Sequence, residues 1–127
     1  MDFQIKLFSW PDKGDHLIMI TRGLLDRAAL KRIFEEVTTV TQPLQDCKVI
    51  IDLQDTVCDF RTAEIENFAG GLKPERWPAT NKVAIVSPHN SEHDQLLVLT
   101  RHLAQLSLKI ALFTDSKSAV NWLTETV

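Results

Sequence analysis

The stretch that decides the fold is VIIDL at residues 49–53, a short apolar run rich in β-branched side chains. A run of this kind is typical of a buried strand in a parallel sheet, because both of its faces are apolar. Two comparable runs follow, VAIV at residues 83–86 and KIALF at residues 109–113. Strands that alternate with helical segments predict right-handed crossovers and a mostly parallel sheet whose two faces both need cover.

Four segments with amphipathic periodicity predict helices. In the first, Leu30, Ile33, Phe34 and Val37 recur at helical spacing, and Asp26 is a candidate cap. The other three are defined by their apolar faces and caps: Ile65, Phe68, Ala69 and Leu72 after Thr62; Leu96, Leu99, Leu103 and Leu106 after Ser91; and Ala119, Val120, Trp122 and Leu123 after Asp115 or Ser116.

The N-terminal part predicts two further strands. Residues 3–8 alternate between apolar and polar side chains, residues 11–15 form a turn cluster, and residues 16–20 form a second strand that Gly23 ends. The short connection makes the pair an antiparallel hairpin. We therefore expect one α/β domain over residues 1–127, with the order β-β-α-β-α-β-α-β-α. Its five-stranded, mostly parallel sheet has an N-terminal antiparallel hairpin and four helices.

Composition narrows the class of protein. The 127 residues are 44% apolar and 24% charged, with a net charge of −3, so a single domain with an ordinary core is expected and a nucleic-acid partner is not. No apolar run reaches the roughly 18 residues of a membrane span. The first residues do not look like a secretory leader, and Cys47 and Cys58 are expected as reduced thiols. These features predict a soluble, cytoplasmic protein.

Two segments carry a resemblance to a known family. KVIIDL at residues 48–53 follows a hairpin and a helix, and KIALFTD at residues 109–115 precedes AVNWL at residues 119–123. This arrangement resembles the STAS domain, and the closing segment resembles its SpoIIAA-like branch, the anti-sigma-factor antagonists. The resemblance covers nearly the whole chain. It implies a non-enzymatic regulatory or binding module.

The resemblance also directs attention to the segment after the third strand. In regulatory members an Asp-Ser-Ser-Gly motif there carries a serine that accepts phosphate from a partner kinase. Here Asp59 can be matched, but Phe60 and Arg61 stand at the serine positions and Thr62 at the glycine. The phosphoacceptor is missing unless Thr62 substitutes. We therefore expect a constitutive module rather than one gated by a kinase.

The candidate binding site lies in the predicted loop at residues 54–60 and the start of the next helix. Open α/β sheets bind ligands at the carboxyl ends of their strands. The residues expected to make contact are Val57, Phe60, Arg61 and Thr62, together with His89 after the fourth strand. The occupant is expected to be a protein partner or a small apolar, lipid-like ligand, since the fold is also similar to Sec14-type lipid-binding domains. A homodimer is a further possibility if the helices cover only one face of the sheet.

A small enzyme is the alternative interpretation. Asp52, Asp55, Cys58 and His89 would gather at the strand ends, where paired carboxylates could do acid–base work or hold a cation. The competing interpretation is that a strand-end Asp caps local backbone amides. The chain has no Gly-x-Ser-x-Gly motif and no glycine-rich phosphate loop. His93 is four residues after His89, but Pro88 places His89 before the helix, so no metal and no cofactor are predicted.

Overall fold

The computed structural model describes residues 2–10, 14–41, 47–58, 82–87, 93–105 and 109–124. Its strands are β1 (Asp2–Trp10), β2 (Gly14–Leu25), β3 (Lys48–Cys58), β4 (Lys82–Val86) and β5 (Lys109–Phe113). Its helices are α1 (Arg27–Thr41), α3 (His93–Gln105) and α4 (Ser116–Thr124). The helix expected after Thr62 lies outside the described residues, so three of the four expected helices are described.

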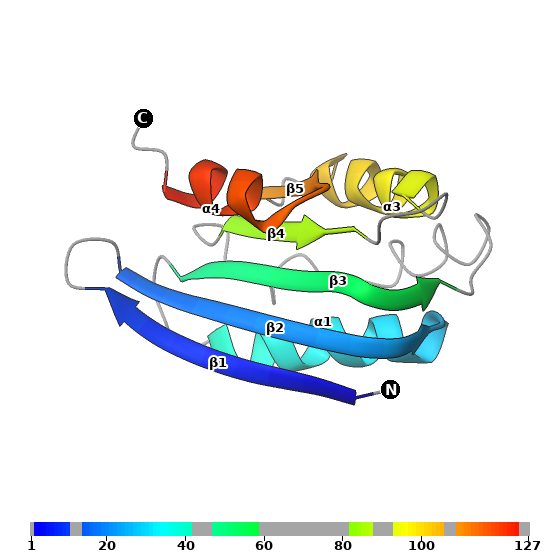
Figure 1. The fold of residues 1–127 in the computed structure, drawn as a ribbon, viewed down its shortest axis with the longest axis horizontal. Helices are drawn as coiled ribbons and strands as arrows, with labels where there is room; N and C mark the ends of the chain where they lie inside the picture. The colour runs from blue at the N-terminus through cyan, green and yellow to red at the C-terminus, as the bar shows by residue number, and fades with distance from the viewer. Residues whose placement is uncertain are drawn as a thin grey trace.

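The five strands form one sheet in the order of the sequence, β1-β2-β3-β4-β5 (Figure 1). β1 and β2 pair antiparallel, with Leu7 opposite Leu17. All later neighbours pair parallel, with Ile51 opposite both Met19 on β2 and Ile85 on β4. The α/β architecture with a parallel sheet and an N-terminal antiparallel hairpin is therefore confirmed.

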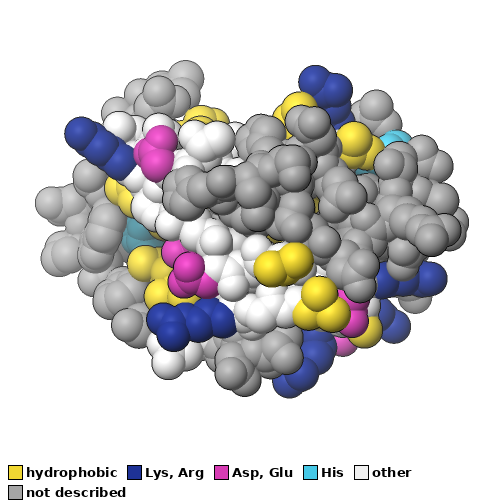
Figure 2. Space-filling view, turned by 45° about the vertical axis from the view of Figure 1, so that its right-hand side comes forward, with side chains coloured by type: hydrophobic (Ala, Val, Ile, Leu, Met, Phe, Trp, Pro, Cys, Tyr) yellow, Lys and Arg dark blue, Asp and Glu magenta, His cyan; other side chains and the backbone are white. Residues whose placement is uncertain are grey.

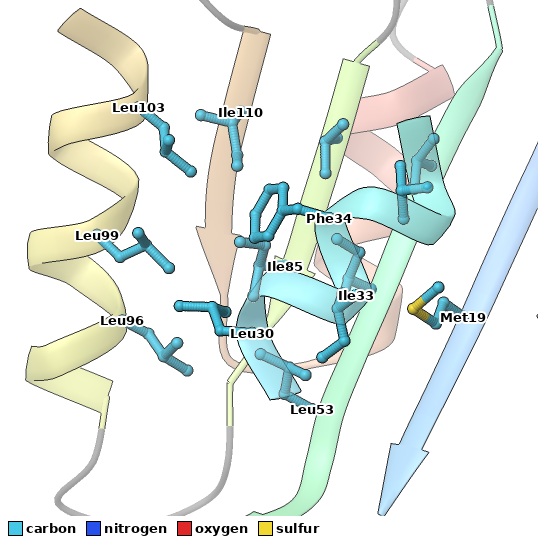
Figure 3. Close-up of a cluster of buried hydrophobic side chains, with 14 of the residues drawn as sticks. Met19, Leu30, Ile33, Phe34, Leu53, Ile85, Leu96, Leu99, Leu103 and Ile110 are labelled. Atoms are coloured by element: carbon cyan, nitrogen blue, oxygen red, sulfur yellow. The ribbon is translucent and has the colours of Figure 1, made fainter. Parts of the chain in front are cut away.

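The larger part of the core lies on the sheet face covered by α1 and α3. Figure 3 shows Leu30, Ile33 and Phe34 of α1 packed in this cluster together with side chains from α3 and the sheet. The contributions of α3 are Leu96, Leu99 and Leu103, all fully buried. The faces predicted for α1 and α3 are thus the faces that are buried, with Leu106 lying outside the described residues.

The opposite face of the sheet is covered by α4. Ala119 and Leu123 of α4 are buried against Ile50, Ala84 and Val86, which project from β3 and β4. Trp122 is half-buried at the edge of this second cluster, with its ring 5.6 Å from that of Phe113. The apolar character of both faces of VIIDL and VAIV is explained by this two-sided cover.

Acidic caps begin two of the helices. The Oδ1 atom of Asp26 accepts a hydrogen bond from the amide of Ala29 at 2.8 Å, as predicted for α1. The Oδ1 atom of Asp115 accepts one from the amide of Ser118 at 2.7 Å, which selects Asp115 over Ser116 as the cap of α4. The proposed cap at Ser91 lies outside the described residues.

Two predicted boundaries are wrong, and the two errors are connected. Gly23 does not end the second strand, because β2 continues to Leu25. The polar segment expected as a loop from Gln54 is strand as far as Cys58. The two extensions pair with each other, from Arg22 opposite Asp55 to Leu25 opposite Cys58, so each supplies the partner that the other needs.

The structure also bears on the expectations about membrane spans and cysteines. Within the described residues, no helix is long and apolar enough to cross a membrane. Cys47, immediately before β3, is fully buried and is present as a thiol. The side chain of Cys58 lies outside the described part of the chain.

Candidate functional site

The carboxyl ends of β2 and β3 project beyond the rest of the sheet. Pairing with β1 stops at Arg22, opposite Asp2, and pairing with β4 stops at Asp52, opposite Val86. Residues 22–25 of β2 and 55–58 of β3 pair with each other, and their one other partner among the described strands is Asp2 of β1, opposite Arg22. We call these two segments the strand-end ribbon.

A β-bulge separates the ribbon from the regular sheet. Ile20 pairs with Asp52 and Arg22 with Asp55, so β3 contains one more residue than β2 over this step. An extra residue reverses which side chains face the core. Asp55 and Val57 are consequently exposed, whereas Thr56 between them is buried.

Side chains satisfy the backbone groups of the bulge. The hydroxyl of Thr21 donates to the carbonyl of Asp52 at 3.0 Å, and that of Thr56 donates to the carbonyl of Leu53 at 2.7 Å. The Oδ1 atom of Asp52 accepts the amide of Gln54 at 3.0 Å. These bonds hold the chain where the regular ladder is interrupted, so the ribbon leaves the sheet in a defined direction.

One face of the ribbon is anchored to the core. Leu25 and Thr56 are buried on this face, and Leu25 joins the cluster under α1. Gly23 lies opposite Thr56 and has a φ of 105°, a conformation that glycine adopts without steric cost. Among the described residues, the core therefore packs against one face of the ribbon and leaves the other face uncovered.

The other face of the ribbon is exposed and carries two apolar side chains. Leu24 and Val57 are register partners, with exposed fractions of 50% and 56%, and they are the exposed large hydrophobic residues among the side chains that the structure describes. Beside them, Nε of Arg22 lies 3.9 Å from Oδ2 of Asp55. Figure 2 brings this end of the sheet forward and shows hydrophobic side chains at the surface near acidic and basic ones. We call Arg22, Leu24, Asp55 and Val57 the contact face.

The N-terminus of α4 lies near the bulge but is already occupied by its own cap. Nε2 of Gln54 donates to the hydroxyl of Ser116 at 3.3 Å, which joins β3 to α4. The hydrogen bonds from the amide and hydroxyl of Ser118 lower the pKa of Asp115 below its ordinary value of 3.8. Because the Asp115 carboxylate already accepts these hydrogen bonds, the N-terminus of α4 is poorly suited to bind a second anion.

The structure brings together part of the predicted site. Val57 lies on the contact face, as an exposed apolar residue at the carboxyl end of a strand. The predicted contacts Phe60, Arg61, Thr62 and His89 lie outside the described residues. Sequence reasoning missed Leu24 and Arg22, because Gly23 was interpreted as the end of the strand. The signal was the matched alternation Arg22–Leu24 and Asp55–Val57, each an ionic residue two positions before an apolar one.

The residues of the enzyme alternative are engaged separately where they are described. Asp52 caps the amide of Gln54, and Asp55 pairs with Arg22. The side chain of Cys58 and all of His89 lie outside the described residues, as does the side chain of His93. Within the described ranges, no group of three or more His, Cys, Asp or Glu residues could hold a metal ion.

No protein-family model matches the sequence, and no curated protein matches it. Solved structures do. An uncharacterized protein of the DUF3478 family from Shewanella loihica, described as having a SpoIIAA-like fold, superposes with a TM-score of 0.54 at 14% identity. The match covers 95% of this chain and 93% of that one. The chain has a SpoIIAA-like fold.

A second SpoIIAA-like structure agrees with this assignment. The anti-sigma factor antagonist SpoIIAA in its unphosphorylated form matches with a TM-score of 0.50 at 12% identity, over 97% of this chain and 100% of that one. The resemblance predicted from residues 48–53 and 109–123 is therefore confirmed at the level of the fold. At these identities the likeness concerns the SpoIIAA-like fold alone.

Proposed function

We propose that this chain is a non-catalytic protein-binding module whose partner docks on the contact face of the strand-end ribbon. The observation that carries the proposal is the pair of exposed apolar side chains, Leu24 and Val57, side by side across two strands. Single exposed apolar residues are ordinary on protein surfaces, whereas adjacent ones at a strand end favour an interface. We expect Phe60 and Arg61, which follow Val57 closely in the sequence, to extend this site.

The shape of the contact face favours a protein over a small ligand. Small apolar ligands bind in concave sites that enclose most of their surface. Leu24 and Val57 instead project from the outer face of a two-stranded ribbon, with an ionic pair at their side. An apolar centre bordered by charged groups is the usual anatomy of a protein–protein contact.

The proposal also covers the extent of the domain, its location in the cell and its regulation by phosphorylation. We propose that residues 1–127 act as one domain, placed in the cytoplasm in keeping with the buried thiol of Cys47. Phe60 and Arg61 cannot accept phosphate, and the hydroxyl of Thr62 is expected to cap the next helix, so we propose that binding is constitutive rather than switched by a kinase. SpoIIAA itself, by the description of its structure, is an anti-sigma factor antagonist, which supports a regulatory role for this fold.

Site-specific photo-crosslinking in the host cell tests the proposal. A photoreactive amino acid at position 57 should give discrete protein adducts, while the same amino acid at position 101, exposed on α3, should not. Leu24→Asp should reduce the adducts at position 57, because an apolar anchor at the centre of an interface contributes about 1–3 kcal/mol. Absence of adducts at position 57, or adducts that Leu24→Asp leaves unchanged, would refute the proposal.

A further inference from the structure

We propose that the partner on the contact face is a second copy of this chain, bound about a two-fold axis that runs parallel to β2 and β3. This inference rests on the proposed function, because it uses the same surface and names its occupant. It is argued from the arrangement of charge and apolar surface over Arg22, Leu24, Asp55 and Val57.

The contact face is self-complementary about one axis only. Its side chains form two rows across the ribbon, Arg22 beside Asp55 and Leu24 beside Val57. A two-fold axis parallel to the strands lays β2 of each copy over β3 of the other. Arg22 then faces Asp55 of the second copy and Leu24 faces Val57, and each contact occurs twice. An axis across the strands would instead set the charged row against the apolar row.

The ion pair between Arg22 and Asp55 of one chain is weak, so both side chains are available to pair with a second chain. The 3.9 Å between Nε of Arg22 and Oδ2 of Asp55 is beyond hydrogen-bonding range, and both side chains are mostly exposed. Exposed pairs of this kind contribute little to the stability of a single chain. A guanidinium group can bind a carboxylate through two parallel hydrogen bonds, so each Arg22 can engage the opposite Asp55 more closely.

The approach to this face is open among the described residues. α4 packs on β3, β4 and β5, and α1 lies behind the sheet in the view of Figure 1, so no described helix stands in front of the ribbon. Ile20 continues the same face of β2 as a half-buried residue. The patch is smaller than the roughly 20–30 residues per side of a standard interface, so we expect a weak dimer.

Charge reversal gives a test that does not depend on an unknown ligand. Arg22→Asp makes the charged row wholly acidic, and Asp55→Arg makes it wholly basic. Sedimentation equilibrium of the full chain, up to about 1 mM, should show the wild type in a monomer–dimer equilibrium. For each variant alone, the dissociation constant of the homodimer should rise more than about tenfold, because like charges then face each other. A mixture of the two variants should form a heterodimer at least as readily as the wild type dimerises.

A matched control is Arg101→Asp, which reverses one charge on the exposed surface of α3 and should leave dimerisation unchanged. Circular dichroism verifies that each variant is folded, and the mixture is itself a test that both remain able to bind. A wild type that stays monomeric to about 1 mM overturns the inference, as does a mixture without heterodimer. If the wild type is monomeric while position 57 crosslinks to a different protein, the second copy is refuted and the proposed function stands. Monomer without any adduct refutes both.

Discussion

Replacing Thr56 by valine should weaken the bulge on which the strand-end ribbon depends. The Thr56 side chain is buried, and its hydroxyl donates to the carbonyl of Leu53 at 2.7 Å. Leu53 falls in the step where the register shifts, and it has no register partner on β2 or β4. Valine keeps the shape of the side chain but leaves the carbonyl without this donor. We expect the free energy of unfolding to fall by about 1–3 kcal/mol, the cost of an unsatisfied buried polar group.

Thr100→Val is the matched control. The Thr100 hydroxyl is also buried and also donates at 2.7 Å, to the carbonyl of Leu96. That carbonyl lies inside α3, where the helix supplies it with a backbone donor. Its loss should therefore change the free energy of unfolding by less than about 0.5 kcal/mol. Urea denaturation of both variants measures the difference. Equal costs for the two substitutions would refute the idea that the bulge carbonyl depends on its threonine hydroxyl more than the helical carbonyl does.

Three further predictions concern the core and the caps. Ile33→Ala, at a fully buried position under α1, should lower the free energy of unfolding by about 2–5 kcal/mol in urea denaturation. Asp26→Ala should cost about 1 kcal/mol in the same assay, because the amide of Ala29 loses its cap, and Asp26→Ser should recover most of it. The folded-state pKa of Asp115 is lowered, so its contribution is complete above the ordinary value of 3.8 and is lost as pH falls through the lower folded value. The thermal stability advantage of wild type over Asp115→Asn should therefore shrink below pH 3.8, and an advantage that grows there would contradict this assignment.

The parts of the fold that the sequence predicted well are those where one physical signal dominates. VAIV and KIALF are short, apolar runs between helical segments, and they became β4 and β5 with boundaries within one residue. Asp26 and Asp115 precede apolar helical patterns, and both are caps. In each case local chemistry and tertiary packing favour the same structure.

The strand-end ribbon could not be predicted in the same way, because its strands depend on each other. Gly23 disfavours a strand, and the polar side chains of Gln54, Asp55 and Thr56 resemble those of a loop. Only the pairing between β2 and β3, together with the bulge, makes both segments extended. Val57 was recognised as part of the site because it is apolar among polar neighbours, whereas Leu24 was missed because it follows the glycine.

The strand order has a consequence for synthesis on the ribosome. Each new strand is added beside the one made before it, so the sheet and its α1 side can assemble progressively from the N-terminus. The second face is completed last, because its described cover is α4, which begins at Ser116. A chain released before that point would present Ile50, Ala84 and Val86 to water. Premature termination near the end of the message should therefore yield an aggregation-prone product rather than a smaller working domain.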